Sequence, residues 1–392
     1  MTIKNSNVLV TGGAGLIGSH LVDILVREYN CRVRILDALV EPTHVKGRKP
    51  PWIPQNVEFV LGDIIDSVTV RKALQNIDFV FHLAASGYVA NRSNGLQNVF
   101  KDATIGTCVI FDVIRQYKLP VKKVVVASSM AVYGCGSYTK KDGTEYIPIR
   151  YRSENAMDQG HFDVYHDGHA CKPYPIKETR VLEPVYPYSI AKLTQEKIAI
   201  AVGREMNLPT VALRYSITYG PRQSLHNPYT GILSVFASNI LNGKPPIVFE
   251  DGNQLRDFIY VEDVARANIF VMENDKTKWE VYNVASGRGG DTVGKVAEMM
   301  CKYLQPHSPR LSPVYNGDYR VFDTRHIVLD PSKLMKLGWK CNIALEEGLK
   351  RHAEWVLKYA KSQNVAETFT EAYGQQLQDG VIKRSAEAVK RH

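Results

Sequence analysis

The chain has 392 residues, 44% of them hydrophobic and 23% charged, which excludes a disordered protein and allows a main domain and a smaller one. No apolar run reaches the length of a membrane span, and the six scattered cysteines are typical of a reducing compartment rather than a disulfide framework. The net charge of +9 is spread along the chain without any nucleic-acid-binding motif, so we expect a cytoplasmic protein that attracts small anions and binds neither nucleic acid nor membrane.

The first predicted unit is a strand, a glycine-rich turn and a helix. Residues 7–11 (NVLVT) form an apolar run, and the sequence GGAGLIG follows at 12–18. Glycines at this spacing allow a tight turn, a close approach of the backbone to a pyrophosphate and close packing of the helix on the strand. The helix N-terminus offers free N–H groups to phosphates. The turn therefore predicts dinucleotide contacts from Gly12, Gly15, Leu16, Ile17 and Gly18.

The next predicted strand favours NAD over NADP. It covers residues 32–36 (RVRIL) and ends at Asp37, 19 residues after Gly18. A carboxylate at this distance accepts hydrogen bonds from the ribose hydroxyls and repels a 2′-phosphate. Alternating strands and helices from residue 5 to about 130 then predict a doubly wound parallel sheet.

Tyr188 and Lys192 are four residues apart near the start of a predicted helix over 186–207. Four residues are about one turn, so both side chains project from the same face. A lysine beside a tyrosine lowers the tyrosine pKa from its usual value of about 10 and makes the phenolate a general base. The pair alone is more typical of a solvated helix face, and the dinucleotide site upstream is what favours the catalytic interpretation.

Taken together, these motifs resemble the extended short-chain dehydrogenase/reductases, in their NAD-dependent sugar-nucleotide epimerase/dehydratase branch. The resemblance runs from about residue 5 to about residue 355. It continues through Gly62-Asp63-Ile64, His82-Leu83-Ala84-Ala85, Ser128-Ser129, the Tyr188 and Lys192 pair, Arg214, Tyr219-Gly220-Pro221-Arg222-Gln223 and Arg256-Asp257-Phe258.

The resemblance implies particular roles for these residues. Ser129, Tyr188 and Lys192 are expected to be catalytic. Besides the glycine turn and Asp37, the residues expected to contact NAD are Asp63, Ile64, Leu83, Ala84, Ala85, Ser128, Tyr188 and Lys192. Helices over 95–117 and 186–207 are expected to form a homodimer interface.

We expect an NAD-binding Rossmann domain over residues 1–216, a smaller mixed α/β substrate domain mainly over 217–360, interleaved with the first, and a helical polar tail over 361–392. Compared with the family, residues 134–180 are an insertion beside the active site. Its Cys135, His161, His166, His169 and Cys171 could bind zinc by their spacing, but no paired Cys-x-x-Cys is present. We therefore predict no metal and favour a lid over the substrate or a dimer contact.

The two residues after Ser129 indicate the reaction. Dehydratases of this family carry Asp-Glu there, and its decarboxylases carry a Glu at the second position. Here the positions hold Met130 and Ala131, which cannot act as acids or bases. Oxidation of the sugar followed by return of the hydride remains, which is epimerisation, preferably at C4.

Arginines suited to a diphosphate indicate the substrate class. By the resemblance, Arg256 and Arg320 would clamp the phosphates of a nucleotide-diphosphate sugar, and Arg222 would also bind the substrate. Two positions depart from the family: Ile217 and Ala103 each replace an Asn. The segments 222–231 and 245–252 are most similar to those of dTDP-L-rhamnose 4-epimerases, and next to those of UDP-sugar 4-epimerases.

Two alternatives to a 4-epimerase stay open from the sequence. One is a dehydratase, decarboxylase or 3,5-epimerase of the same family. The other is a non-catalytic NAD-binding scaffold, against which the intact Ser129, Tyr188 and Lys192 argue.

Overall fold

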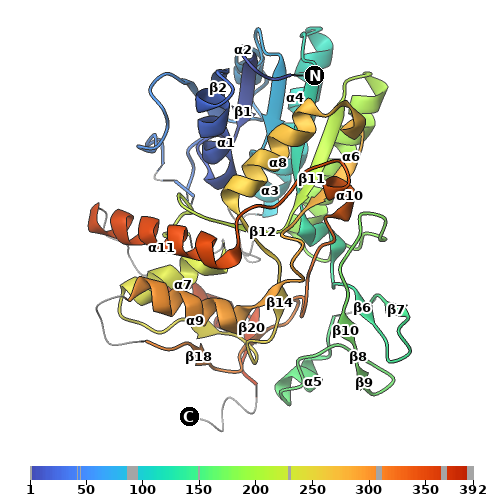
Figure 1. The fold of residues 1–392 in the computed structure, drawn as a ribbon, viewed down its shortest axis with the longest axis vertical. Helices are drawn as coiled ribbons and strands as arrows, with labels where there is room; N and C mark the ends of the chain where they lie inside the picture. The colour runs from blue at the N-terminus through green and yellow to red at the C-terminus, as the bar shows by residue number, and fades with distance from the viewer. Residues whose placement is uncertain are drawn as a thin grey trace.

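The computed structural model describes residues 2–385 except 42, 45, 86–95, 149–150, 228–230, 306–310 and 363–368. A seven-stranded parallel sheet forms the upper part of the molecule in Figure 1. Its strand order is β16-β11-β5-β4-β1-β2-β3. The strands are β1 (Asn7–Thr11), β2 (Arg32–Asp37), β3 (Glu58–Leu61), β4 (Phe79–His82), β5 (Lys123–Ser129), β11 (Thr210–Tyr215) and β16 (Val281–Val284). The predicted doubly wound parallel sheet is confirmed.

The sheet is covered by helices on both faces, which explains why its central strands β1, β4 and β5 are mostly apolar and buried. Alternate residues of a strand point to opposite faces. Val8 and Val10 join one core cluster with side chains of α1 (Leu16–Arg27) and α8 (Val261–Glu273), while Leu9 joins a second cluster with α2 (Ser67–Ala73) and α4 (Gly106–Gln116). The long helix α6 (Pro187–Glu205) packs beside α4 on that second face.

The predicted helix over 186–207 is confirmed by α6. The predicted helix over 95–117 is divided into α3 (Leu96–Phe100), a π-helical segment η1 (Lys101–Ile105) and α4, with residue 95 outside the described part of the chain.

A smaller part of the molecule lies below the sheet in Figure 1. Its helices α7 (Ile232–Leu241), α9 (Val293–Leu304) and α11 (Leu345–Ser362) share an apolar core that includes Leu233, Val296 and Leu349. Its short strands are β12 (Ile217–Tyr219), β13 (Ile247–Val248), β14 (Leu255–Arg256), β15 (Phe258–Tyr260), β17 (Asp291–Thr292), β18 (Val314–Tyr315), β19 (Tyr319–Arg320) and β20 (Ile382–Lys383). The domain boundaries at 216 and 360 remain a prediction.

The insertion over 134–180 extends from the molecule at the lower right of Figure 1. It contains the strands β6 (Tyr138–Thr139), β7 (Glu145–Tyr146), β8 (Tyr165–His166), β9 (His169–Ala170) and β10 (Lys172–Pro173) and the helix α5 (Glu154–Asp158). Tyr138, Val164 and Cys171 form a small core of its own. Lys383 of β20 pairs with Glu154, so the tail is attached to the insertion. The described part of the tail comprises the helix α12 (Phe369–Gln378) and β20.

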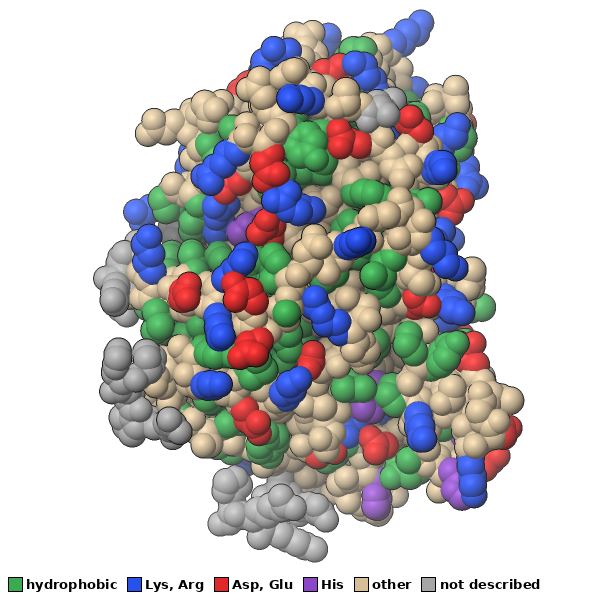
Figure 2. Space-filling model, viewed as in Figure 1, with side chains coloured by type: hydrophobic (Ala, Val, Ile, Leu, Met, Phe, Trp, Pro, Cys, Tyr) green, Lys and Arg blue, Asp and Glu red, His purple; other side chains and the backbone are tan. Residues whose placement is uncertain are grey.

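Charged side chains are dispersed over the surface, as the spread of basic residues along the chain predicts. On the face in Figure 2, lysine and arginine side chains are interspersed with acidic ones. Among the described helices, none combines the length and apolar composition required to cross a bilayer.

Candidate active site

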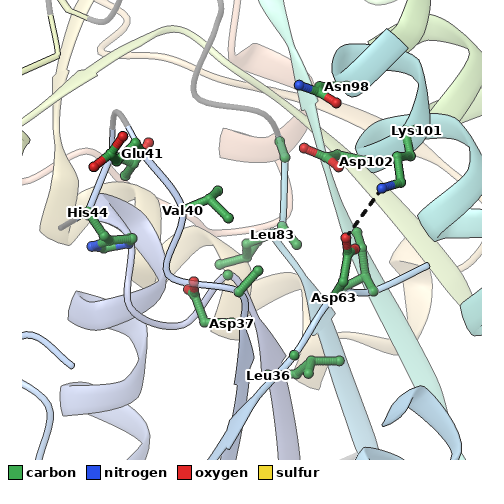
Figure 3. Close-up of a pocket in the computed structure, with 18 residues that line it drawn as sticks. Leu36, Asp37, Val40, Glu41, His44, Asp63, Leu83, Asn98, Lys101 and Asp102 are labelled. Atoms are coloured by element: carbon green, nitrogen blue, oxygen red, sulfur yellow. Dashed lines mark ion pairs between the residues drawn. The ribbon is translucent and has the colours of Figure 1, made fainter. Parts of the chain in front are cut away.

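A cavity of about 340 Å³ lies at the carboxyl ends of β1 to β4, where the strand order reverses between β1 and β4 (Figure 3). Parallel α/β sheets bind their ligands at this position. Eight residues predicted to contact a cofactor line the cavity: Gly12, Gly15, Asp37, Asp63, Ile64, Leu83, Ala84 and Ala85. The sheet therefore brings together residues from four separate strand ends.

The glycine turn is packed so closely that side chains are excluded from it. Gly12 has a φ of +69°, and a Cβ there would lie 2.8 Å from the backbone nitrogen of Ala84. A Cβ at Gly18 would overlap the carbonyl oxygen of Gly12. These restrictions fit a turn that presents bare backbone to a pyrophosphate.

Asp37 is held in one orientation at the cavity wall. Its Oδ2 accepts a hydrogen bond from the backbone nitrogen of Ala14, and its Oδ1 accepts one from that of Leu39, both at 3.0 Å. The carboxylate thus lies between the glycine turn and the loop after β2, where the adenosine ribose of a dinucleotide is expected.

Sequence reasoning missed two groups of residues in this cavity. The loop after Asp37 contributes Ala38, Val40, Glu41, Thr43 and His44, and the segment that begins at α3 contributes Asn98, Lys101 and Asp102. Leu36 and Gly62 complete the lining. The loop could have been inferred from its position directly after the predicted ribose-binding acid, whereas no sequence signal marks the second group.

Tyr188 and Ser129 lie together, on α6 and at the end of β5, the strand that pairs with β4. Burial raises the pKa of Tyr188, and a hydrogen bond with Ser129 opposes this rise. Ser129 Oγ also accepts a hydrogen bond from the backbone nitrogen of Ala131 at 3.2 Å. The hydroxyl and the phenol are therefore near enough to act on one substrate group.

The predicted lowering of the Tyr188 pKa by Lys192 is not what the structure shows. Lys192 is almost completely buried, and its Nζ donates to the carbonyl oxygen of Ala127 at 2.9 Å and to Oε1 of Gln195 at 2.8 Å. Burial lowers the Lys192 pKa to about 7, which Asp102 opposes. Burial penalises the charged form of both residues and is the largest influence on each pKa.

The remaining predicted cofactor residues do not line the cavity. Leu16 and Ile17 pack against the apolar core of the smaller part. Ser128 donates from Oγ to Oε2 of Glu196 at 2.7 Å, so its hydroxyl faces α6. Gly18, Tyr188 and Lys192 are also absent from the cavity wall.

The arginines predicted to bind substrate have protein partners. Arg222 pairs with Asp23 of α1 at 2.6 Å, and Arg320 lies over the ring of Phe249. Arg256 donates to the carbonyl oxygens of Leu255, Thr324 and Arg325 and pairs with Asp323 at 3.5 Å.

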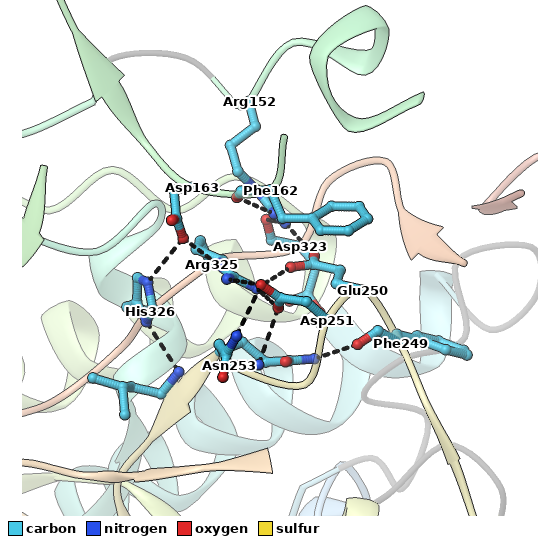
Figure 4. A network of polar contacts seen from close by, with 12 residues as sticks. Arg152, Phe162, Asp163, Phe249, Glu250, Asp251, Asn253, Asp323, Arg325 and His326 are labelled. Carbon is cyan, nitrogen blue, oxygen red and sulfur yellow. Dashed lines mark hydrogen bonds and ion pairs between the residues drawn. The ribbon is translucent and has the colours of Figure 1, made fainter. Parts of the chain in front are cut away.

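Sequence reasoning missed Arg152, which the insertion contributes to this region. Figure 4 shows Arg152 beside Glu250, to which it donates at 2.7 Å, and it also donates to the carbonyl oxygen of Asp323. Arg256, Arg320 and Arg152 together hold the pKa of the Asp323 carboxyl below its usual value. Three guanidinium groups thus converge on one carboxylate.

The histidines and cysteines of the insertion serve separate purposes. His166 stacks edge-on against Tyr146, and Cys171 is buried in the small core of the insertion. In the part of the chain that the structure describes, no group of three or more His, Cys, Asp or Glu side chains is arranged to hold a metal ion.

The fold and the cavity together define a dinucleotide-binding protein of the doubly wound α/β class, with a Ser, Tyr and Lys set beside the dinucleotide site. Residues 8–285 match the model of the NAD dependent epimerase/dehydratase family. The chain belongs to this family.

Individual relatives agree with this assignment. The dTDP-L-rhamnose 4-epimerase of Burkholderia thailandensis is 28% identical over 92% of this chain and 98% of its own length. A putative UDP-glucose 4-epimerase of Methanocaldococcus jannaschii is 33% identical over 89% and 98%. The solved UDP-glucose 4-epimerase of Thermus thermophilus in complex with NAD superposes with a TM-score of 0.69 at 28% identity, over 90% of this chain and 99% of that one. Relatives named dTDP-glucose 4,6-dehydratase also match.

Proposed function

We propose that the chain is a nucleotide-diphosphate-sugar 4-epimerase that uses tightly held NAD. Within the family, the proposal of an epimerase rather than a dehydratase or decarboxylase rests on Met130 and Ala131, directly after Ser129. Met130 packs against an apolar cluster that contains Val132, and Ala131 is buried, so neither supplies an acid or base for elimination. A cycle that oxidises and then reduces the same carbon needs neither group.

The residues present fit NAD. The bare glycine turn suits the pyrophosphate, and the fixed carboxylate of Asp37 suits the ribose hydroxyls. When bound, NAD supplies the acceptor for the hydride and returns it later. Two of the three proposed catalytic residues act on the sugar hydroxyl: Ser129 orients it through a hydrogen bond, and the Tyr188 phenolate removes its proton.

The second half of the cycle uses the same groups in reverse. After the keto sugar has rotated to present its other face, the neutral Tyr188 phenol would return the proton to the carbonyl oxygen. The proposed role of Lys192 is to hold positive charge near the phenolate and to contact the nicotinamide ribose. The net result is an inverted carbon with no change in composition.

The arginines around Asp323 support a diphosphate substrate. Guanidinium groups from three segments, at Arg152, Arg256 and Arg320, act on the Asp323 carboxylate, and such groups suit the geometry of a diphosphate. Arg152 is almost completely buried together with Glu250, so the proposed site includes the insertion. A nucleotide diphosphate would bind by competing with Asp323 for these donors.

A homodimer is also proposed, through α4 and α6. Ile190 of α6 and Ile105 just before α4 are apolar side chains that are exposed in the single chain. The family resemblance implies an interface on these helices, which would cover both side chains. Light scattering coupled to size-exclusion chromatography would give the mass of a dimer if this proposal holds.

Activity is tested by incubating the purified protein with a panel of UDP-, dTDP-, GDP- and CDP-sugars and resolving the products by chromatography and NMR. We expect one base to be preferred and one pair of C4 epimers to interconvert. No conversion of any member, with NAD bound, would favour the scaffold alternative.

A further inference from the structure

A chain of buried polar side chains leads from the glycine turn to Lys192. Thr11, at the end of β1, lies 2.8 Å from Nδ1 of His82, and Nε2 of His82 lies 3.1 Å from Nε2 of Gln195. Gln195 Oε1 then accepts from Lys192 Nζ at 2.8 Å. Thr11, His82 and Gln195 have no exposed surface, and Lys192 is 2% exposed. Buried polar groups are kept only where each has a partner.

The donors and acceptors of this chain allow one consistent arrangement. Thr107 donates its hydroxyl proton to the carbonyl oxygen of Ala103 at 2.6 Å, so its Oγ1 can only accept from Gln195 and His82. His82 must therefore carry its proton on Nε2, which donates to Thr107 Oγ1 at 2.9 Å, while Nδ1 accepts from the Thr11 hydroxyl. Gln195 Nε2 also donates to Thr107 Oγ1, at 3.1 Å.

The charge of His82 agrees with this arrangement. Burial, and secondly Lys192, lower the His82 pKa to about 3, so the ring is neutral at physiological pH. Because Thr107 Oγ1 only accepts, Gln195 presents its N–H group to Thr107. The oxygen of the amide is thereby directed at Lys192.

Few other titratable groups face Lys192 from the surrounding elements. Asp102 of η1 is the acidic one, and burial raises its pKa to about 6. Glu196 of α6 is occupied by Arg214 of β11 and by Ser128 of β5. Tyr188, on the preceding helical turn, completes the set. Two uncharged acceptors, Ala127 O and Gln195 Oε1, are therefore the direct partners of the ammonium.

We propose that Gln195 is a positioning residue for Lys192: its side-chain oxygen, oriented by His82 and Thr107, holds the ammonium group in place beside Tyr188. This inference deepens the proposed function and rests on it. His82 and Thr107 act through Gln195, and Thr11 connects the same chain to the backbone nitrogen of Ala84, at the cofactor cavity. The cofactor-binding backbone and the lysine thus share one rigid hydrogen-bonded support.

The first test does not depend on activity. Long-range ¹H–¹⁵N NMR of the full-length protein labelled with ¹⁵N-histidine reports which ring nitrogen is protonated. We expect His82 to be protonated at Nε2 and not to titrate above pH 5. Protonation at Nδ1 would leave Thr107 without the proton that His82 donates, so His82 and Thr107 could not orient the Gln195 amide as described, which overturns the proposal. The signal is assigned by substituting the other histidines with lowered pKa values: His20, His44, His226, His326 and His352.

The second test compares Gln195→Met, which keeps the length but removes the acceptor, with Gln195→Glu, which keeps an acceptor. An ammonium that loses an acceptor is easier to deprotonate. In Gln195→Met, the alkaline limb of the kcat/KM profile should therefore move to lower pH by about one unit or more. In Gln195→Glu, the alkaline limb should not move to lower pH. Thr194→Ala, at the preceding position of the helix, is the matched control because the described hydrogen bond of Thr194 goes to the carbonyl oxygen of Ile190.

If Gln195 only packs in the core and does not position Lys192, we expect a different outcome. Gln195→Met would then lower the melting temperature but leave the pH profile superimposed on that of the parent. An alkaline limb that moves equally in Gln195→Glu would also overturn the proposal. If no sugar is converted at all, the proposed function fails, and the tautomer of His82 still decides this inference.

Discussion

The guanidinium of Arg214 makes two parallel hydrogen bonds with the carboxylate of Glu196, from Nη2 to Oε1 at 2.6 Å and from Nε to Oε2 at 2.9 Å. The side chains are 3% and 1% exposed. The pair joins β11 to α6, and Ser128 of β5 donates to the same carboxylate. It therefore fixes the helix that carries Tyr188 and Lys192 onto the central strands.

Glu196→Gln should lower the free energy of unfolding by about 3–5 kcal/mol, because Arg214 would keep a buried charge without its counter-charge. Urea unfolding measures the loss. The control is Glu205→Gln on the same helix, whose pair with Arg115 is 3.4 Å long and exposed. Its effect should stay below about 1 kcal/mol. Equal losses in both variants would contradict the role given to Arg214 and Glu196.

Asp37→Asn should weaken NAD binding about tenfold and reduce the preference over NADP, because the amide neither accepts two ribose hydrogen bonds nor repels a 2′-phosphate. Calorimetric titration with both dinucleotides measures the change. Glu41→Gln is the matched control, since Glu41 lines the same cavity on the loop after Asp37. NADP recovered in stoichiometric amount from the denatured parent protein would refute the prediction that Asp37 selects NAD over NADP.

Tyr188→Phe should reduce turnover by about 10² or more while NAD binding and the melting temperature persist, because only the proton acceptor is removed. Ser129→Ala should also lower turnover with little effect on folding. Tyr117→Phe, at an exposed tyrosine after α4, should change nothing. Near-parental turnover in Tyr188→Phe would exclude Tyr188 as the base.

The cofactor-site residues that the sequence predicts are those that directly follow a predicted strand. The glycine turn and Asp37 belong to consecutive short segments, so their spacing alone placed them at the edge of the sheet. His44 could have been inferred only from its place on the loop directly after Asp37, and Asp102 could not be found at all, because the π-helical η1 has no periodic signal.

The hydrogen-bonded side chains that hold Lys192 could not be predicted from the sequence for another reason. His82 and Gln195 are 113 residues apart and meet only because β4 and α6 pack together. The tyrosine pKa was predicted in the wrong direction because sequence spacing reveals a neighbouring charge and says nothing of burial. Asp263 of α8 accepts hydrogen bonds from the backbone nitrogens of Asn342 and Ile343, a contact that sequence spacing does not reveal either.

Asp163 should make stability depend on pH. A hydrogen bond with His326 and the charge of Arg325 lower its pKa from the usual 3.8 to about 2 against the effect of burial. A lowered folded-state pKa means that the stabilisation is complete above pH 5 and is lost as the pH falls from about 4 to about 2. Asp163→Asn should therefore be less stable than the parent at pH 7, with a smaller difference at pH 3.

Urea midpoints at the two pH values measure this effect. Asp112→Asn, at an exposed position of α4, should show the same small difference from the parent at both. A constant difference for Asp163→Asn would mean that its contacts with Arg325 and His326 contribute no pH-dependent stability.

The chemical outcome separates an epimerase from a dehydratase or decarboxylase. Since Met130 and Ala131 offer no acid or base, the product should have the mass of the substrate, without net NADH, a 4-keto-6-deoxy sugar or carbon dioxide. Substrate deuterated at C4 should keep its label, because hydride leaves and returns on one bound cofactor. Mass spectrometry and NMR of the product measure both properties.

A product lighter by one water or one carbon dioxide would require an acid from elsewhere. The insertion offers Glu145, Glu154 and Asp163, but Glu154 pairs with Lys383 and Asp163 pairs with Arg325 at 2.9 Å. Glu145 lies exposed on β7. Substituting each by its amide would identify the acid in that case, whereas in an epimerase all three amide variants should convert substrate without any loss of mass.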